Sequence, residues 1–191
     1  MWLQRTLITL VLLTMQSAHN GDAKPAEEEC NSISSCSSCL SKSFCVWCVN
    51  KGKCTRQSCG SDNHIHPKNV ADALMSGPKF CPRVVESEKQ MTFASGKKAT
   101  IVVKITQIHI YMAFTPWKCK IDVNGKETEV NALLVDDEVY CESVELINDT
   151  DSPFVIGYVQ VLWEYINAFD GLQTFRLCSC DLDPNCGACN S

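Results

Sequence analysis

Residues Cys30–Cys59 read CNSISSCSSCLSKSFCVWCVNKGKCTRQSC, and this stretch decides the fold of the first part of the chain. Its seven cysteines are separated by five, two, five, two, five and four residues. Mostly polar and small residues fill the gaps, so the segment cannot bury enough carbon to fold by hydrophobic collapse alone. We therefore expect disulfides to hold it, and disulfides persist only in an oxidising compartment.

The N-terminus provides a route to such a compartment. An apolar run, Leu7–Met15 (LITLVLLTM), follows the single positive charge of Arg5, and small and polar residues come after it. This pattern is typical of a secretory signal peptide, which we place at residues 1–23; the alternative is a short buried helix. The run is shorter than the about twenty apolar residues of a membrane-spanning helix. We expect a secreted or extracellular chain with no membrane span of its own.

Composition narrows the possible partners. The net charge is −5, and no cluster of basic residues is present, so nothing favours a nucleic-acid partner. The fourteen cysteines are an even number, which in an exported chain indicates pairs. The sequon Asn148-Asp149-Thr150 makes Asn148 a candidate glycosylation site. The alternative is an unmodified asparagine in a turn.

From Pro82 onward, apolar and polar residues alternate with a period of two. Ile101, Val103 and Ile105 lie on one side of a predicted strand, and further strands are predicted at 118–123, 126–130, 138–142, 155–165 and 173–177. Asn124-Gly125 lies between two of these strands and indicates a tight hairpin. Short strands with almost no helical periodicity predict an antiparallel β-sandwich of Ig-like type, about ninety residues long.

Two cysteines are expected inside this sandwich. Cys119 points to the same side as Trp117 and Ile121, and Cys141 to the same side as Val139. A disulfide between them would contribute about 3 kcal/mol by restricting the unfolded chain. The alternative is two free buried thiols.

The C-terminal cysteines repeat the spacing of the first module. Cys180, Cys186 and Cys189 are separated by five and two residues, as are the first three cysteines of the chain. We interpret them as the truncated start of a second module. Together with Cys178, they can pair among themselves, crosslink to another chain, or belong to a fragment of a longer product.

Several residue patterns suggest chemistry, but each is weak. The pair Cys186-x2-Cys189 matches a thiol–disulfide exchange motif without the helix that would activate it. The Cys-x2-Cys pairs of the first module lie too close together for a zinc ribbon, and His64 and His66 lack a third metal ligand. No histidine lies in a recognised catalytic motif. We predict a chain that is not an enzyme, with no catalytic residues, no metal and no cofactor.

The cysteine pattern resembles a known domain. Its form is Cys30-x5-Cys36-x2-Cys39-x5-Cys45-x-Trp47-Cys48-x5-Cys54-x4-Cys59, closed by Cys81-Pro82, and it is similar to the PSI domain of plexins, semaphorins and integrins. The segments that follow, among them Trp117-Lys118-Cys119 and the strand that ends at Cys141, resemble the IPT (TIG) domain that follows a PSI domain in plexin ectodomains.

The eight cysteines of the first module could pair in roughly a hundred ways, and the residues alone do not decide between them. The family resemblance implies one pattern. The implied PSI pairs are Cys30 with Cys45, Cys36 with Cys81, Cys39 with Cys54, and Cys48 with Cys59. The implied IPT pair is Cys119 with Cys141.

The expected fold class is a small disulfide-rich PSI-like knot followed by an all-β Ig-like (IPT/TIG) sandwich. The expected segments are a signal peptide at 1–23, a disordered leader at 24–29, a PSI-like cysteine-rich domain at 30–81, an IPT-like β-sandwich at 82–178, and the truncated start of a second PSI-like module at 180–191.

The resemblance implies an extracellular segment of a plexin-like semaphorin receptor, acting as a rigid spacer or interaction module in cell-surface signalling. Its partner would be an extracellular protein such as a semaphorin or a receptor ectodomain, and the segment would lie at the plasma membrane if it belongs to a full-length receptor. The sequence shows none of the plexin β-propeller, transmembrane helix or cytoplasmic GTPase-activating region. The alternative is a free-standing secreted adaptor with an unrelated extracellular partner.

Overall fold

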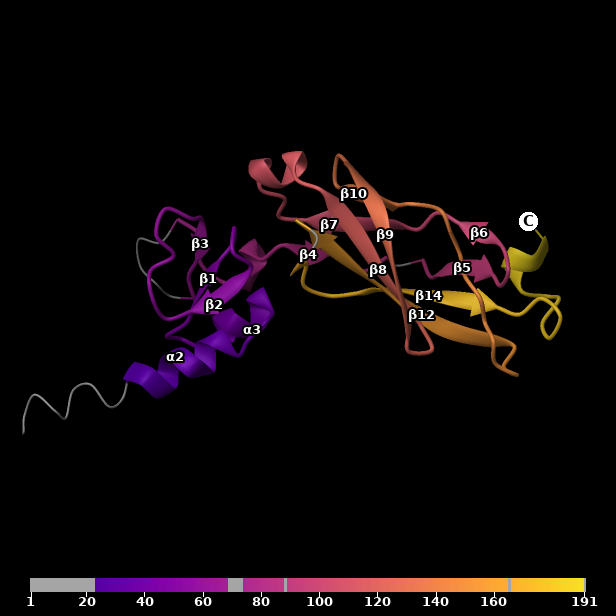
Figure 1. Ribbon diagram of the computed structural model, residues 1–191, viewed down its shortest axis with the longest axis horizontal. Helices are drawn as coiled ribbons and strands as arrows, with labels where there is room; N and C mark the ends of the chain where they lie inside the picture. The colour runs from indigo at the N-terminus through magenta and orange to yellow at the C-terminus, as the bar shows by residue number, and fades with distance from the viewer. Residues whose placement is uncertain (1–22, 69–73, 88, 165, 191) are drawn as a thin grey trace, which may run out of the picture. The chain divides into compact units, whose positions relative to one another are not determined.

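The computed structural model describes residues 23–68, 74–87, 89–164 and 166–190 (Figure 1). All but the last residue of the expected signal peptide lies outside these residues. The chain divides into two compact units, Met1–Phe80 and Cys81–Ser191. Each unit has its own buried interior, so each is described by itself.

The first unit is built from short elements. They are α2 (Ala23–Asn31), α3 (Cys36–Ser41), β1 (Val46–Cys48), β2 (Lys53–Thr55), β3 (His64–Ile65) and the 3₁₀ turn η1 (Pro78–Phe80). Helix α3 begins after Ser35, whose hydroxyl accepts a hydrogen bond from the backbone N–H of Ser38. The strands form an antiparallel sheet in the order β2-β1-β3. The buried residues of this unit are mainly cysteines, as a stapled domain requires.

The segment before Cys30 differs from what its sequence predicts. Residues 24–29 were expected to be disordered, but they lie in helix α2. The carboxylate of Glu27 accepts hydrogen bonds from the hydroxyl of Thr55 (2.9 Å) and from the backbone N–H of Arg56 (3.0 Å). Cys30, in the last turn of α2, is disulfide-bonded to Cys45. Contacts distant in sequence therefore order a segment whose own composition favours disorder.

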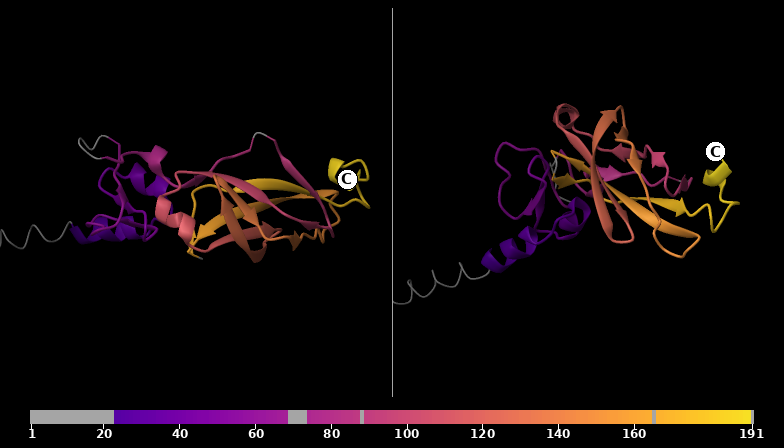
Figure 2. Two further views of the ribbon diagram at one scale, coloured as in Figure 1. Left: turned by 90° about the horizontal axis from the view of Figure 1, so that it is seen from above. Right: turned by 45° about the vertical axis from the view of Figure 1, so that its right-hand side comes forward.

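The second unit is almost entirely β-structure. Its elements are β4 (Arg83–Val84), β5 (Met91–Ala94), β6 (Lys98–Ala99), β7 (Val102–Thr106), the 3₁₀ turn η2 (Ile110–Phe114), β8 (Trp117–Val123), β9 (Lys126–Val135), β10 (Glu138–Cys141), β11 (Val144–Glu145), β12 (Phe154–Trp163), β13 (Asn167–Ala168), β14 (Gln173–Cys178) and the 3₁₀ turn η3 (Gly187–Asn190). Figure 2 shows these strands from two further sides. A small disulfide-rich unit followed by an all-β unit is the expected architecture, which is thus confirmed.

The main sheet of this unit has the strand order β4-β7-β10-β9-β8-β12-β14-β5, with β13 paired to β12. Strand β9 connects the two halves of this order because it changes partners at Ala132: residues before it pair with β8, and residues after it pair with β10. Burial alternates strictly along β8, so one of its faces packs in the core. The core side chains come from both halves, among them Ile101, Val103, Ile105, Ile121, Val139, Val159, Val161, Phe175 and Leu177.

The hairpin between β8 and β9 is confirmed. Val123 pairs with Lys126, and the two residues between them, Asn124 and Gly125, have φ values of 54° and 76°. Both residues of such a turn need positive φ, which Asn and Gly tolerate best. The fold differs from the sequence analysis at β5, which was not predicted and which runs parallel to β14.

The parallel pair follows from the path of the chain. Strand β4 pairs antiparallel with β7, whereas the next strand in sequence, β5, pairs with β14 at the other end of the strand order. The first two strands of the unit thus lie at the two ends of the strand order. The expected sandwich is consequently not purely antiparallel.

Candidate functional site

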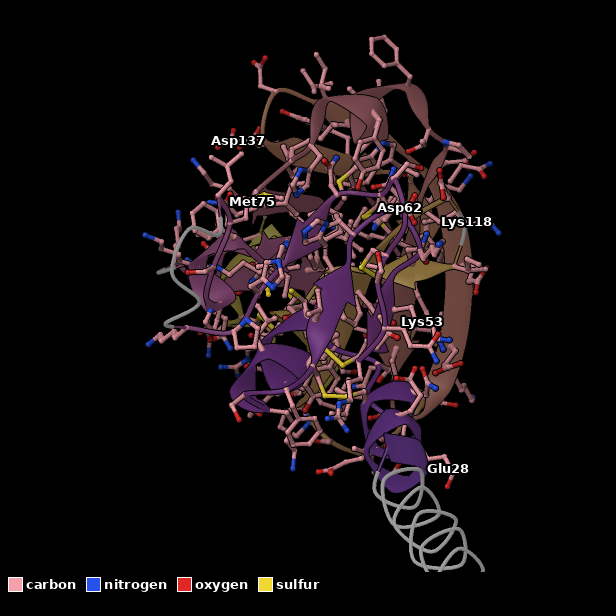
Figure 3. The ribbon with its side chains drawn as sticks, turned by 90° about the vertical axis from the view of Figure 1, so that its left-hand side faces the viewer. Glu28, Lys53, Asp62, Met75, Lys118 and Asp137 are labelled. Atoms are coloured by element: carbon pink, nitrogen blue, oxygen red, sulfur yellow. A yellow bond between two sulfur atoms is a disulfide. The ribbon has the colours of Figure 1, made fainter. Side chains whose placement is uncertain are left out.

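The disulfides of the first unit form its interior. Cys30 is bonded to Cys45, Cys39 to Cys54, and Cys48 to Cys59, at sequence separations of 15, 15 and 11. These cysteines are at most 4% exposed, and Figure 3 shows sulfur–sulfur bonds within the ribbon of this unit. Closing such short loops restricts the unfolded chain, which stabilises a unit with little apolar interior. The partners are those that the family resemblance implies for these six cysteines.

Cys36 and Cys81 are each disulfide-bonded as well, and the chain has no free cysteine among its described residues. The implied bond between these two residues stays a prediction. Such a bond would connect α3 of the first unit to the residue that begins the second unit, so it matters most for any mechanical role.

Two tryptophans, Trp47 and Trp163, are buried in the cores of their units. Trp47 is 4% exposed on β1, where it pairs with Cys54 on one side and Ile65 on the other. Trp163 is 2% exposed near the end of β12, and the ring of Tyr111 meets it edge to face at 5.8 Å. Neither side chain is left at a surface for a partner.

In the second unit, Cys119 of β8 is bonded to Cys141 of β10. Strand β9 lies between these two strands in the sheet order, and both sulfurs are buried, so the bond joins the two halves of the sheet through the core. The alternative, two free buried thiols, is therefore excluded for this pair.

The four C-terminal cysteines pair among themselves. Cys178, the last residue of β14, is bonded to Cys186, and Cys180 is bonded to Cys189. The sequence left three possibilities open for these cysteines, and the structure has the first of them, pairing among the four. The two short loops close the tail onto the end of β14 and hold η3 beside β5.

The described residues offer no thiolate for a metal. The sulfurs of Cys30, Cys45 and Cys54 lie within 4.8 Å of one another, but each is committed to a disulfide and cannot act as a ligand. The rings of His64 and His66 meet edge to face, with centroids 4.8 Å apart. Burial, with a smaller contribution from the nearby His64, lowers the pKa of His66. Within the part of the chain that the structure describes, no third ligand joins this pair.

The sequon lies in a tight turn. Asn148 is 9% exposed, its amide nitrogen donates to the carbonyl of Ser152 (2.9 Å), and its side-chain oxygen accepts from the backbone N–H and hydroxyl of Thr150. This is an Asx turn, the ordinary structural use of asparagine. A glycan would replace one of the two amide hydrogens, and the other suffices for the bond to Ser152. Glycosylation of Asn148 therefore stays a prediction.

One loop presents large apolar side chains to solvent. Ile110 and Phe114, at the two ends of η2, are 84% and 86% exposed. Between them Met112 is fully buried, and its carbonyl accepts hydrogen bonds from Thr115 and from the indole nitrogen of Trp117 (3.0 Å). The loop is thus anchored by its centre while its ends stay exposed. Sequence analysis missed it because period-two alternation stops before this segment.

No helix in the described part of the chain combines the length and the apolar composition needed to cross a bilayer.

Comparisons with known proteins identify the first unit and the fold. A family model described as PSI, plexin repeat, matches residues 29–74. A solved structure of the full extracellular region of plexin A4 matches with a TM-score of 0.59 and 19% sequence identity, over 79% of this chain. The match spans only 15% of that plexin chain. No curated protein sequence matches.

A PSI domain is an extracellular receptor module and not an enzyme. At this low identity, the likeness to plexin A4 shows the fold alone. The chain carries a plexin repeat in its first unit, and over most of its length it has the fold of a plexin-family ectodomain segment.

Proposed function

We propose that this chain is an extracellular segment of a plexin-like semaphorin receptor and acts as a rigid spacer or interaction module. The observation that carries the proposal is the order of domains, a plexin repeat followed by an all-β domain, which is similar to part of the plexin A4 ectodomain. The disulfides support an extracellular location, because such bonds persist outside the reducing cytosol. The chain acts by position and contact, without catalysis.

A spacer must keep its shape under load. Each unit is crosslinked internally, and the loops closed in the first unit are short. The predicted bond between Cys36 and Cys81 would fasten the start of the second unit to the first. Covalent bonds at these places would prevent local opening from changing the length or direction of the segment.

Small-angle X-ray scattering of the purified chain tests the spacer function. A rigid spacer requires one relative arrangement of the two units, so a single arrangement should reproduce the scattering curve. Replacing Cys36 and Cys81 together by serine should broaden the distribution of overall dimensions. A wild-type curve that only an ensemble of arrangements can fit would contradict rigidity.

The second candidate is a free-standing secreted adaptor, and the exposed loop at η2 favours it. Ile110 and Phe114 are apolar, almost fully exposed and held by a buried centre, which are properties of a contact surface. Purified chain titrated over cells that display semaphorins, and over cells that do not, separates the candidates. An isolated spacer should show no saturable binding to either.

An adaptor should bind saturably, and replacing both Ile110 and Phe114 by serine should remove that binding. Leu182→Ser is the matched control because Leu182 is an exposed apolar residue in the tail, in a different segment of the unit.

A further inference from the structure

Strand β5 forms one end of the main sheet of the second unit. Among the strands that the structure describes, it pairs with β14 alone, and the backbone N–H of Ser95 donates to the carbonyl of Cys178 (2.8 Å). In a parallel pair, every second residue directs both its backbone N–H and its C=O group to the same neighbouring strand. The backbone groups of Met91, Phe93 and Ser95 are therefore directed at β14. The N–H and C=O groups of Thr92 therefore point away from the sheet, where no described strand pairs with them.

A second uncovered edge belongs to β7. The backbone carbonyl of Ile101 accepts a hydrogen bond from the N–H of Cys141, and the N–H of Ile105 donates to the carbonyl of Asp137. The backbone groups of the odd-numbered residues of β7 are therefore directed at β10. Even-numbered residues face the opposite side, where β4 pairs only with the last residues of β7. The outward backbone groups of Val102 thus lie beyond the end of β4, with no strand partner among the described residues.

The two uncovered edges border the same groove. A hollow of about 690 Å³ is lined by Thr92 of β5 and Val102 of β7, together with Met91 and Phe93. These four residues are half-buried, whereas Lys89, at the groove's end before β5, is exposed. The groove therefore combines unpaired backbone donors and acceptors with a partly apolar lining and one cation.

We propose that this groove binds an extended segment of a partner polypeptide, which adds as a strand to the free edge of β5. A backbone in strand conformation supplies N–H and C=O groups at the spacing that Thr92 and its neighbours require. Strand β5 (MTFA) contains no proline and no charge, the devices that protect an edge from pairing. Lys89 favours a carboxylate at the corresponding end of the bound segment.

This binding function goes beyond the spacer function and does not depend on it. A spacer needs only the internal crosslinks, and an adaptor using η2 needs only that loop. The groove is formed by β5, β7, the chain between β4 and β5, and η3. Loss of strand binding would consequently leave the scattering and cell-binding experiments unaffected.

The test uses the full exported chain and a displayed library of random peptides. Peptides selected on the wild-type chain are synthesised, and their dissociation constants are measured on Thr92→Pro and Thr92→Val. Proline removes the outward N–H of Thr92 without removing a hydrogen bond to β14, as edge positions allow. Valine keeps the N–H and the β propensity. We expect about tenfold weaker binding to Thr92→Pro and nearly unchanged binding to Thr92→Val.

A second measurement keeps the proposal testable if Thr92→Pro does not fold. Selected peptides are N-methylated at one backbone position at a time and bound to the wild-type chain. Strand addition predicts that methylation at alternate positions weakens binding and that methylation at the positions between does not. The proposal is overturned if no selected peptide shows this alternation, if the folded Thr92→Pro variant binds as tightly as wild type, or if selection yields no binding peptide.

Discussion

Gly157 is the position where a single methyl group should disturb the sheet of the second unit most. It lies on β12 directly opposite Phe175 of β14. A Cβ atom at this position would stand 2.1 Å from Cζ of Phe175, and 2.6 and 2.7 Å from the two Cε atoms. Carbon atoms pack at about 3.5–4.0 Å, so the ring would have to move by roughly 1.5 Å. Phe175 is 0% exposed, so the ring has little room to move.

The Gly157→Ala variant should therefore lose about 1–3 kcal/mol of the free energy of unfolding of the second unit. Calorimetry and urea unfolding of the intact chain measure this loss as a shift of the transition assigned to that unit. Gly187→Ala is the matched control, because no heavy atom lies within 4 Å of its added Cβ. The control should change stability by less than about 0.5 kcal/mol.

A double-mutant cycle identifies the cause. Phe175→Leu in the Gly157→Ala background shortens the group that the new methyl meets, so part of the lost stability should return. The coupling free energy between the two positions should exceed about 0.5 kcal/mol. If Gly157→Ala is as stable as Gly187→Ala, or if the two substitutions are simply additive, the close packing of Phe175 over Gly157 is refuted.

Three further predictions concern a disulfide, a histidine and the N-terminal helix. Replacing Cys119 and Cys141 together by alanine should cost the second unit about 3 kcal/mol, because the bond spans 22 residues in sequence; equal denaturation midpoints with and without the bond would contradict this. Burial lowers the pKa of His109, so between its folded and unfolded pKa values the unfolded state binds more protons, and stability is lost as pH falls below about 6.5. His109→Gln should flatten this slope in unfolding measured across that pH range, and an unchanged slope would exclude His109 as its source. Glu27→Ala should cost about 1–2 kcal/mol of local stability, so a protease should cleave α2 in limited proteolysis. Glu28→Ala leaves the hydrogen bonds of Glu27 to Thr55 and Arg56 in place, so this control should resist cleavage as wild type does.

Much of the second unit could be predicted because its signals are local. The alternation at Ile101, Val103 and Ile105 requires only that one face of a strand be buried, and the structure has all three buried. Asn124-Gly125 specifies its hairpin through backbone conformation alone. Strand β5 could not be predicted in this way, because its four residues are placed by pairing with β14, which is distant in sequence.

The remaining failures have the same origin. Helix α2 is ordered by Glu27 and by the bond at Cys30, neither of which is visible in the composition of the leader. The pairing of the C-terminal cysteines depends on where β14 ends. The groove beside β5 is defined by backbone groups that lack a strand partner, and no residue pattern marks such a gap.

The central claim is that disulfides, and not a large apolar interior, hold the first unit in its folded form. The most direct test is peptide mapping by mass spectrometry of the exported protein, alkylated under native conditions and digested without reduction. We predict peptides linked through Cys30–Cys45, Cys39–Cys54, Cys48–Cys59 and Cys36–Cys81, with no alkylated cysteine in this set. Alkylated thiols among these eight residues in the folded protein would contradict the account.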